Sequence, residues 1–179
     1  MTATHRILCP TDLTSNSQDS VAYALRLAKE NSAELIVIHA ISFPTLSQLP
    51  CELEAYYYQW EQCLARFKVD QLIVDAERRV RNFVGTRFGA ESDSVVWKPR
   101  AALGEVAEEI VRAAFQEEVD LIVMDRCKRS GLARLFRPSI PEAVGRRAPC
   151  PVLSIDTTQF VSSSRARRLP LLRGLFQSP

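Results

Sequence analysis

The sequence predicts a parallel α/β sheet of five strands, doubly wound by helices, over residues 1–156. Short and nearly continuous apolar runs alternate along the chain with segments whose apolar residues recur at helical spacing. Apolar runs of this kind are typical of strands in a parallel sheet that is covered on both faces. The order strand, helix, strand repeats as far as a fifth strand, which implies one sheet with right-handed crossovers.

The first strand, helix and strand are the clearest part of this pattern. Residues 6–10 form a short apolar run that ends at Pro10, and residues 34–40 form a longer one. Between them, residues 17–31 repeat apolar side chains at helical spacing, after a stretch of turn and cap residues at 11–17. This segment therefore predicts two strands joined by one helix.

A long helix is predicted next. Residues 43–50 contain two prolines and are typical of a loop, and residues 52–88 then carry apolar side chains at steps of three and four. Gly89 offers a C-terminal stop, because glycine readily takes the left-handed conformation that ends many helices. A break near residues 69–72 is the alternative to one continuous helix.

The second half of the chain continues the alternation, and its first strand is the weakest of the five. The predicted elements are strand 94–98, helix 105–116, strand 120–124, helix 140–147 and strand 151–155. In a sheet of this type, ligands collect where the first and fourth strands end. We therefore expect residues 10–12 to lie beside residues 125–139.

The loop after the fourth strand has the frame of an anion site but lacks its glycines. A loop that leaves a parallel strand and enters a helix often binds phosphate through backbone N–H groups, and glycines allow the close approach. Gly131 is the one glycine between Asp125 and Pro141. The sequence thus predicts a ligand site whose phosphate-binding chemistry is altered.

Five short motifs stand out along the chain: PTD at 10–12, VIHA at 37–40, DLIVM at 120–124, SGLARL at 130–135 and RRAPCPVL at 146–153. Together they resemble the universal stress protein family. The resemblance covers residues 4–156 and implies a flavodoxin-like, adenine nucleotide alpha hydrolase-like fold. It also implies a non-enzymatic stress-response protein and a homodimer that pairs through the fifth strand, here Pro151 to Ile155.

The resemblance places the glycine signature of the family's nucleotide-binding branch on three residues that are not glycine. The first position falls at Asp125, the second at Lys128 and the third at Pro138, while the closing hydroxyl is kept as Ser139. Asp125 adds negative charge where a triphosphate would approach, and Pro138 lacks a backbone N–H donor. These changes predict that ordinary ATP binding is lost.

The resemblance also implies nucleotide contacts, several of which have a structural alternative. Asp12 could instead cap the turn before the first helix, and Ser139 could cap the helix that follows it. Met124 and Ala40 are apolar residues at strand ends, where core residues are common. The implied contacts are Pro10, Thr11, Asp12, Ala40, Met124, Ser139 and Ile140.

A basic cluster in the loop offers a different way to bind an anion. Arg126, Lys128 and Arg129 could bind phosphate through side-chain charge, and one of them could pair with Asp125. The alternative is an ordinary solvated loop. An adenine nucleotide such as ATP therefore remains an open alternative to a protein without a cofactor.

Charge is unevenly distributed along the chain. Residues 1–125 hold 12 Lys and Arg against 19 Asp and Glu, whereas residues 126–179 hold 11 basic and 2 acidic residues. This asymmetry favours an anionic or protein partner for the C-terminal third, or its neutralisation by the acidic part of a second subunit. Residues 157–179 are predicted to be a separate basic tail.

The sequence shows no catalytic set and no metal motif. His39 lies in a predicted strand and is expected to be a core or interface residue, and Cys9 and Cys150 are expected to be buried. Cys127 lies between basic residues and is a weaker candidate for redox sensing. There is no secretory signal or membrane-spanning run, which favours a cytoplasmic protein.

The leading interpretation is a regulatory, non-enzymatic stress-response binding protein that has lost ordinary ATP binding. The first alternative is a nucleotide-binding protein that uses the basic loop for the phosphates. The second is an interaction module that acts through the basic tail.

Overall fold

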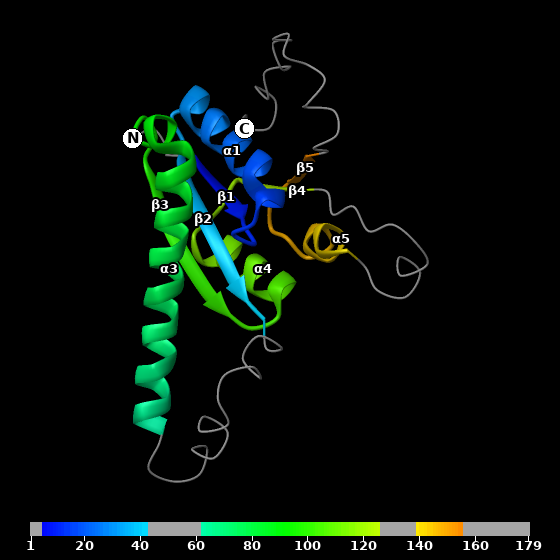
Figure 1. Cartoon of the computed structure of the whole chain (residues 1–179). Coiled ribbons are helices and arrows are strands. Elements are labelled where there is room, and N and C mark those ends of the chain that lie inside the picture. The colour runs from blue at the N-terminus through cyan, green and yellow to red at the C-terminus, as the bar shows by residue number, and fades with distance from the viewer. Residues whose placement is uncertain (1–4, 43–61, 126–138, 156–179) are drawn as a thin grey trace.

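The computed structural model describes residues 5–42, 62–125 and 139–155. These residues form a five-stranded parallel sheet in the order β3-β2-β1-β4-β5. The strands are β1 (Arg6–Pro10), β2 (Glu34–Ile41), β3 (Trp97–Leu103), β4 (Leu121–Asp125) and β5 (Val152–Ile155). The predicted parallel α/β class is confirmed, with β1 at the centre of the sheet (Figure 1).

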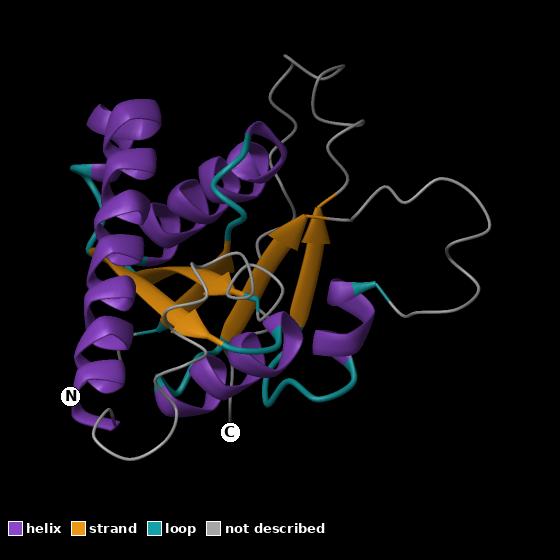
Figure 2. Cartoon of the chain, turned by 60° about the horizontal axis from the view of Figure 1, so that its bottom comes forward, coloured by secondary structure: helices purple, strands orange, loops and turns teal. Residues whose placement is uncertain are grey.

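Helices cover both faces of the sheet, as Figure 2 shows. On one face, α1 (Gln18–Asn31) and α3 (Gln62–Ser92) pack on side chains such as Ile7, Leu35 and Val123. On the other face, α4 (Val106–Gln116) and α5 (Ile140–Gly145) pack on the alternate residues, such as Leu8 and Ile122. Successive strand residues point to opposite faces, so both sets are fully buried and the apolar runs are continuous.

The third strand lies further along the chain than predicted. Residues 93–95 form a turn, in which the N–H of Val95 donates to the Ser92 carbonyl at 3.2 Å, and β3 begins only at Trp97. Among the described strands, β3 pairs with β2 alone, and it is mostly half-buried. An edge strand of this kind can include Lys98, Pro99 and Arg100. The two charged side chains, and a proline without a backbone N–H, interrupt the apolar pattern from which a strand is predicted.

The long helix does not stop at Gly89 as predicted. Helix α3 extends to Ser92, with one residue of non-helical backbone at Phe88 (φ −128°, ψ 17°). The Phe88 ring packs edge-on against Phe83, with 6.3 Å between ring centroids, and this contact holds the distorted turn on the core. The predicted start at 52 lies outside the described residues, and the backbone around 69–72 is continuous helix.

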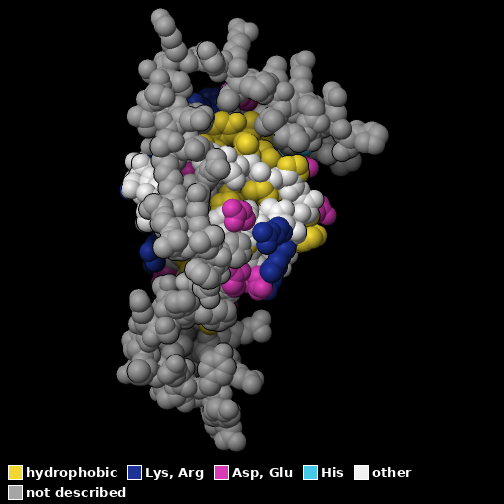
Figure 3. All heavy atoms as spheres, turned by 90° about the vertical axis from the view of Figure 1, so that its right-hand side faces the viewer, with side chains coloured by type: hydrophobic (Ala, Val, Ile, Leu, Met, Phe, Trp, Pro, Cys, Tyr) yellow, Lys and Arg dark blue, Asp and Glu magenta, His cyan; other side chains and the backbone are white. Residues whose placement is uncertain are grey.

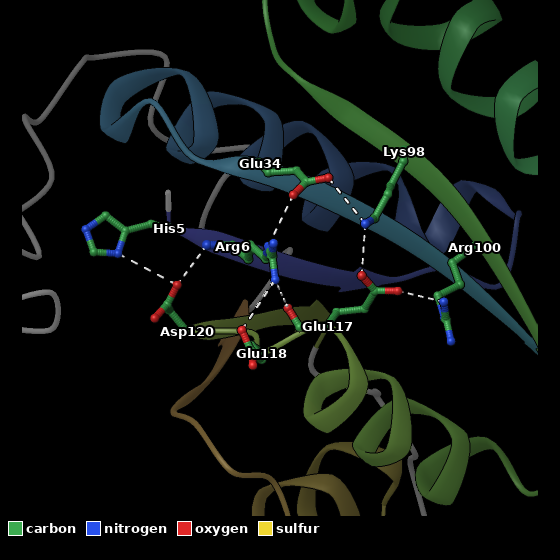
Figure 4. Close-up of polar contacts among 8 residues, drawn as sticks. All are labelled: His5, Arg6, Glu34, Lys98, Arg100, Glu117, Glu118 and Asp120. Atoms are coloured by element: carbon green, nitrogen blue, oxygen red, sulfur yellow. Dashed lines mark hydrogen bonds and ion pairs between the residues drawn. The ribbon is translucent and has the colours of Figure 1, made fainter. Parts of the chain in front are cut away.

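Polar side chains form a network at the amino ends of the strands, opposite the predicted ligand site at their carboxyl ends (Figure 4). Glu117, which follows α4, accepts hydrogen bonds from Lys98 Nζ at 2.9 Å and from Arg100 Nη1 at 2.6 Å. The guanidinium of Arg6 in β1 donates to the Glu117 carbonyl at 2.8 Å and to Glu34 at 3.3 Å. This network connects β1, β2 and β3 to the start of β4.

Candidate functional site

A cavity of about 540 Å³ opens where β1, β2 and β4 end, between the first turn of α4 and the start of α5. The strand order reverses between β1 and β4, and such a switch point is the usual ligand position in an open parallel sheet. The volume suits a small organic molecule. The cavity is lined by Pro10, Thr11, Asp12, Ser15, Asn16, Ser17, His39, Ala40, Val106, Ile110, Met124, Asp125, Ile140 and Pro141.

The structure brings six of the predicted contact residues together around this cavity. They are Pro10, Thr11, Asp12, Ala40, Met124 and Ile140. Ser139 does not line it and instead begins α5 with a capping box, in which its hydroxyl accepts from Glu142 N–H and Glu142 accepts from Ser139 N–H. Arg126, Lys128 and Arg129 lie outside the described residues.

The turn from β1 into α1 forms one wall of the cavity and is built by short polar side chains. Asp12 Oδ1 accepts hydrogen bonds from the N–H and the hydroxyl of Thr14 at 2.9 and 2.8 Å. The hydroxyls of Thr11 and Ser17 lie 2.7 Å apart. Burial alone would raise the pKa of Asp12, but hydrogen bonds, chiefly from Thr14, outweigh it and lower that pKa. Asp12 is therefore an ionised carboxylate beside the cavity as well as the predicted turn cap.

His39 contributes a polarised imidazole from β2. Its Nδ1 lies 2.9 Å from the backbone carbonyl of Thr11. Because a carbonyl can only accept, Nδ1 carries a proton, and Nε2 of the neutral ring is an acceptor. His39 is half-buried and lines the cavity. The residue that was expected to lie in the core or at an interface is therefore part of the site.

Asp125 ends β4 and faces the cavity from the opposite side. Ser20 Oγ donates to its Oδ2 at 2.8 Å, while its buried Oδ1 has no hydrogen-bond partner in the described part of the chain. Burial raises the pKa of Asp125 to about 6, and the nearby carboxylates of Asp19 and Asp12 add to the rise. The cations expected to pair with Asp125, namely Arg126, Lys128 and Arg129, lie outside the described residues, so this pairing stays a prediction.

Cys9 lies close to this carboxylate but is not suited to act as a nucleophile. It is fully buried in β1, and burial together with the charge of Asp125 raises the pKa of its thiol. Cys150 is half-buried, and burial raises the pKa of its thiol to about 11. Both thiols are thus in the protonated, unreactive form near neutral pH. Cys127 lies outside the described residues.

Several lining residues were not predicted as contacts. Ser15, Asn16 and Ser17 were assigned only to the turn and cap, although their position directly after a strand end was a usable signal. Val106, Ile110 and Pro141 face the cavity because helices α4 and α5 cross its open side. No local sequence pattern identifies such helix residues, because their position depends on how the helices pack.

The site is amphipathic and carries negative charge. Val106, Ile110, Met124, Ile140 and Pro141 give it an apolar side, and hydroxyls, an amide, an imidazole and two carboxylates give it a polar side. No Lys or Arg is among the described lining residues. The apolar side suits a flat, partly apolar molecule, and the charge of Asp125 disfavours a phosphate that approaches it directly, because like charges repel.

Among the described residues, no group of three or more His, Cys, Asp or Glu side chains could hold a metal ion. No helix in the same part of the chain is long and apolar enough to span a membrane.

A doubly wound α/β domain with a cavity at its switch point is the architecture of a large class of α/β proteins, in which ligands commonly bind at this point. Within this class, the model of the universal stress protein family matches residues 3–155. The Universal stress protein MJ0531 of Methanocaldococcus jannaschii is 30% identical over 150 residues, which cover 84% of this chain and 81% of that protein. The chain belongs to the universal stress protein family.

Solved structures of the same family share the fold. The universal stress protein UspA from Lactobacillus plantarum is 26% identical and superposes with a TM-score of 0.54 over 86% of this chain and 99% of its own. A universal stress protein in complex with cAMP is 20% identical, with a TM-score of 0.58 over 87% of this chain and 99% of its own. These likenesses support the predicted fold class.

Proposed function

We propose that this universal stress protein is a non-enzymatic regulatory binding protein that does not bind ATP in the ordinary manner of its family. The observation that carries the proposal is the carboxylate of Asp125 at the end of β4, where the glycine signature of the nucleotide-binding branch begins. A glycine there would let backbone N–H groups turn toward a phosphate and approach it closely, whereas Asp125 places a carboxylate there, and its Oδ1 has no hydrogen-bond partner among the described residues.

Nucleotide binding is the second candidate. The cavity has the volume and the apolar side that a purine needs, and a structurally similar universal stress protein is known in complex with cAMP. In this candidate, Arg126, Lys128 and Arg129 supply the charge that the missing glycines do not.

Calorimetric titration of nucleotide-stripped protein with ATP, with AMP as the control, separates the two. We expect Kd values weaker than about 1 mM for both nucleotides. An Asp125→Gly variant should tighten ATP binding, and Asp125→Asn should reveal how much of the change is charge alone. Micromolar ATP binding by the unaltered protein, abolished by Lys128→Ala, would overturn the proposal in favour of the basic loop.

We propose that residues 1–156 form the ligand-binding domain and that residues 157–179 are a basic arm for an acidic protein or another anionic partner. The charge asymmetry of the sequence supports this division. Deleting 157–179 should remove a salt-dependent interaction and leave the thermal unfolding of the domain unchanged.

We further propose a homodimer that pairs through β5, which is hydrogen-bonded to β4 alone among the described strands. Figure 3 looks onto the side of the molecule that carries β5 and α5, where hydrophobic side chains gather between the residues drawn in grey. An edge strand flanked by apolar surface is suited to pairing with a second copy.

A further inference from the structure

We propose that the outer edge of β3 is closed to pairing with another copy of this chain, by Pro99 in its outward hydrogen-bonding row and by Lys98 beside it. Of the two described edge strands, only β5 can then extend the sheet into a second copy, so that assembly stops at a dimer. This last step rests on the proposed function, because it takes β5 as the dimer strand.

The hydrogen bonds between β2 and β3 determine which backbone groups of β3 point outward. The Leu35 N–H donates to the Val96 carbonyl at 2.9 Å, and the Gly104 N–H donates to the Ile41 carbonyl at 2.9 Å. In a parallel pair, alternate residues of a strand bond to the same neighbour, and the register places Leu35 opposite Trp97. The residues that direct their N–H or C=O groups away from β2 are therefore Trp97, Pro99, Ala101 and Leu103.

Pro99 interrupts this outward row. Proline has no backbone N–H, so a strand added along the edge finds no donor at this position. The next outward residue, Ala101, is only 9% exposed, because it packs with Ala76 of α3 and Ile41 of β2 in a small apolar cluster. No two consecutive outward donors of β3 are thus accessible to a second strand.

Lys98 opposes pairing in a second way. Two identical edges related by a two-fold axis pair in antiparallel orientation. If Trp97 of each copy paired with residue 99 of the other, the two copies of Lys98 would lie directly opposite each other, where like charges are destabilising. The Lys98 ammonium lies 3.3 Å from Glu34 and 2.9 Å from Glu117, and these contacts keep it beside the strand. Lysine and proline are both residues by which edge strands resist pairing.

Strand β5, at the opposite end of the sheet, has neither feature (Figure 1). Its register with β4 directs the backbone groups of Val152 and Ser154 outward, and both residues carry an N–H. The sequence of β5 contains no charged residue. The two edges therefore differ in the two properties that decide whether a strand accepts a partner.

The difference matters because two open edges would not stop at two copies. A dimer joined through β5 carries one β3 edge at each end of its combined sheet. Pairing between these edges would link dimers into open-ended chains, whereas a closed β3 leaves a finite assembly.

The experiment restores the missing donor and measures assembly of the full-length protein. Pro99→Thr adds an N–H next to that of Trp97 and gives β3 two consecutive outward donors, as many as Val152 and Ser154 give β5. Sedimentation velocity over a wide range of protein concentrations should show species that grow with concentration and reach at least about twice the mass of the unaltered assembly. Pro99→Ala restores the same donor and decides the question if Pro99→Thr does not fold.

Lys98 is tested with a matched pair of variants. Lys98→Gln alone should assemble like the unaltered protein, because Pro99 still interrupts the row. The double variant Lys98→Gln with Pro99→Thr should form the larger species at lower concentration than Pro99→Thr does, because the opposed charges are gone. Circular dichroism establishes that each variant is folded.

The outcomes separate this inference from the proposed dimer. Folded Pro99→Thr and double variants that assemble no further than the unaltered protein would overturn the inference, and so would larger species formed by Lys98→Gln alone. A monomeric unaltered protein would refute the β5 dimer, whereas dimers of Pro99→Thr in that case would still support the closure of β3.

Discussion

The ionised carboxylate of Asp125 destabilises the folded protein, because it is partly buried. Its unfolded pKa is near 3.8 and burial raises its folded pKa to about 6, so the folded state holds this proton more tightly. Stability is therefore unaffected by this group at low pH, falls as the pH rises from about 4 to 6, and stays lowered above that range. A cost of this kind is commonly retained at a functional site.

We predict that Asp125→Asn stabilises the protein at about pH 8 and not at about pH 3, below both pKa values of Asp125. After allowance for solvent screening of this partly exposed group, the gain should be about 1 kcal/mol, or about 2–4 °C in Tm. Thermal unfolding followed by circular dichroism at both pH values measures it. Asp93→Asn, which removes an exposed charge after α3, serves as the control, and an equal gain at both pH values would show that the carboxylate charge is not the cause.

Some residues of the cavity could be predicted from the sequence, and others could not. Thr11, Asp12 and Met124 could be placed at the site because they follow or end strands whose order fixes where they meet. His39 was expected to be a core or interface residue, although it directly precedes Ala40, the end of the predicted strand 34–40, and so lies close to the site. The burial of Asp125 Oδ1 depends on α1 packing across β4, which a local pattern does not contain.

At the scale of elements, the ends were harder to predict than the elements themselves. Strand β1 was predicted at its observed bounds because it is apolar after Arg6 and is ended by Pro10. The predicted bounds of the edge strand β3 were wrong because this strand contains no long apolar run. Besides its pairing with β2, it is held by ion pairs of Lys98 and Arg100 with Glu117. Glu117 makes these pairs from the turn after α4, far away in sequence.

We predict that Glu117→Gln destabilises the protein by about 1–3 kcal/mol, since it removes the charge from two hydrogen bonds to β3. The hydrogen bond from Lys98 lowers the pKa of Glu117, so its stabilisation is present above the unfolded value of 4.5 and is lost as the pH falls through the lower folded pKa. Urea unfolding at about pH 7 and at about pH 3 measures both effects.

Glu118→Gln is the matched control for this change. The Glu118 side chain is 87% exposed and lies 3.8 Å from Arg6 Nη1, so its loss should change stability by less than about 0.5 kcal/mol. Equal effects of the two substitutions would mean that the network in Figure 4 acts only through general surface charge.

At the scale of the whole molecule, the alternation of elements determined the layers, and the described sheet ends in two edge strands, β3 and β5, of which β5 is the proposed dimer strand. The Ile122 N–H donates to the Pro151 carbonyl at 3.0 Å. In a parallel pair, backbone groups alternate between the two sides of a strand, so Leu153 bonds toward β4 and Ser154 directs its N–H away from it. Ser154 is also exposed, which makes its N–H a donor for a second copy.

We predict that Ser154→Pro shifts the protein from dimer to monomer, because proline removes this outward donor and leaves the bonds to β4 in place. Sedimentation equilibrium over a range of protein concentrations measures the change, and circular dichroism establishes that the variant is folded. Ser154→Ala keeps the N–H and should remain dimeric. A folded Ser154→Pro protein that dimerises as strongly as Ser154→Ala would place the dimer contact elsewhere, and a monomeric unaltered protein would show that β5 is an unpaired edge in solution.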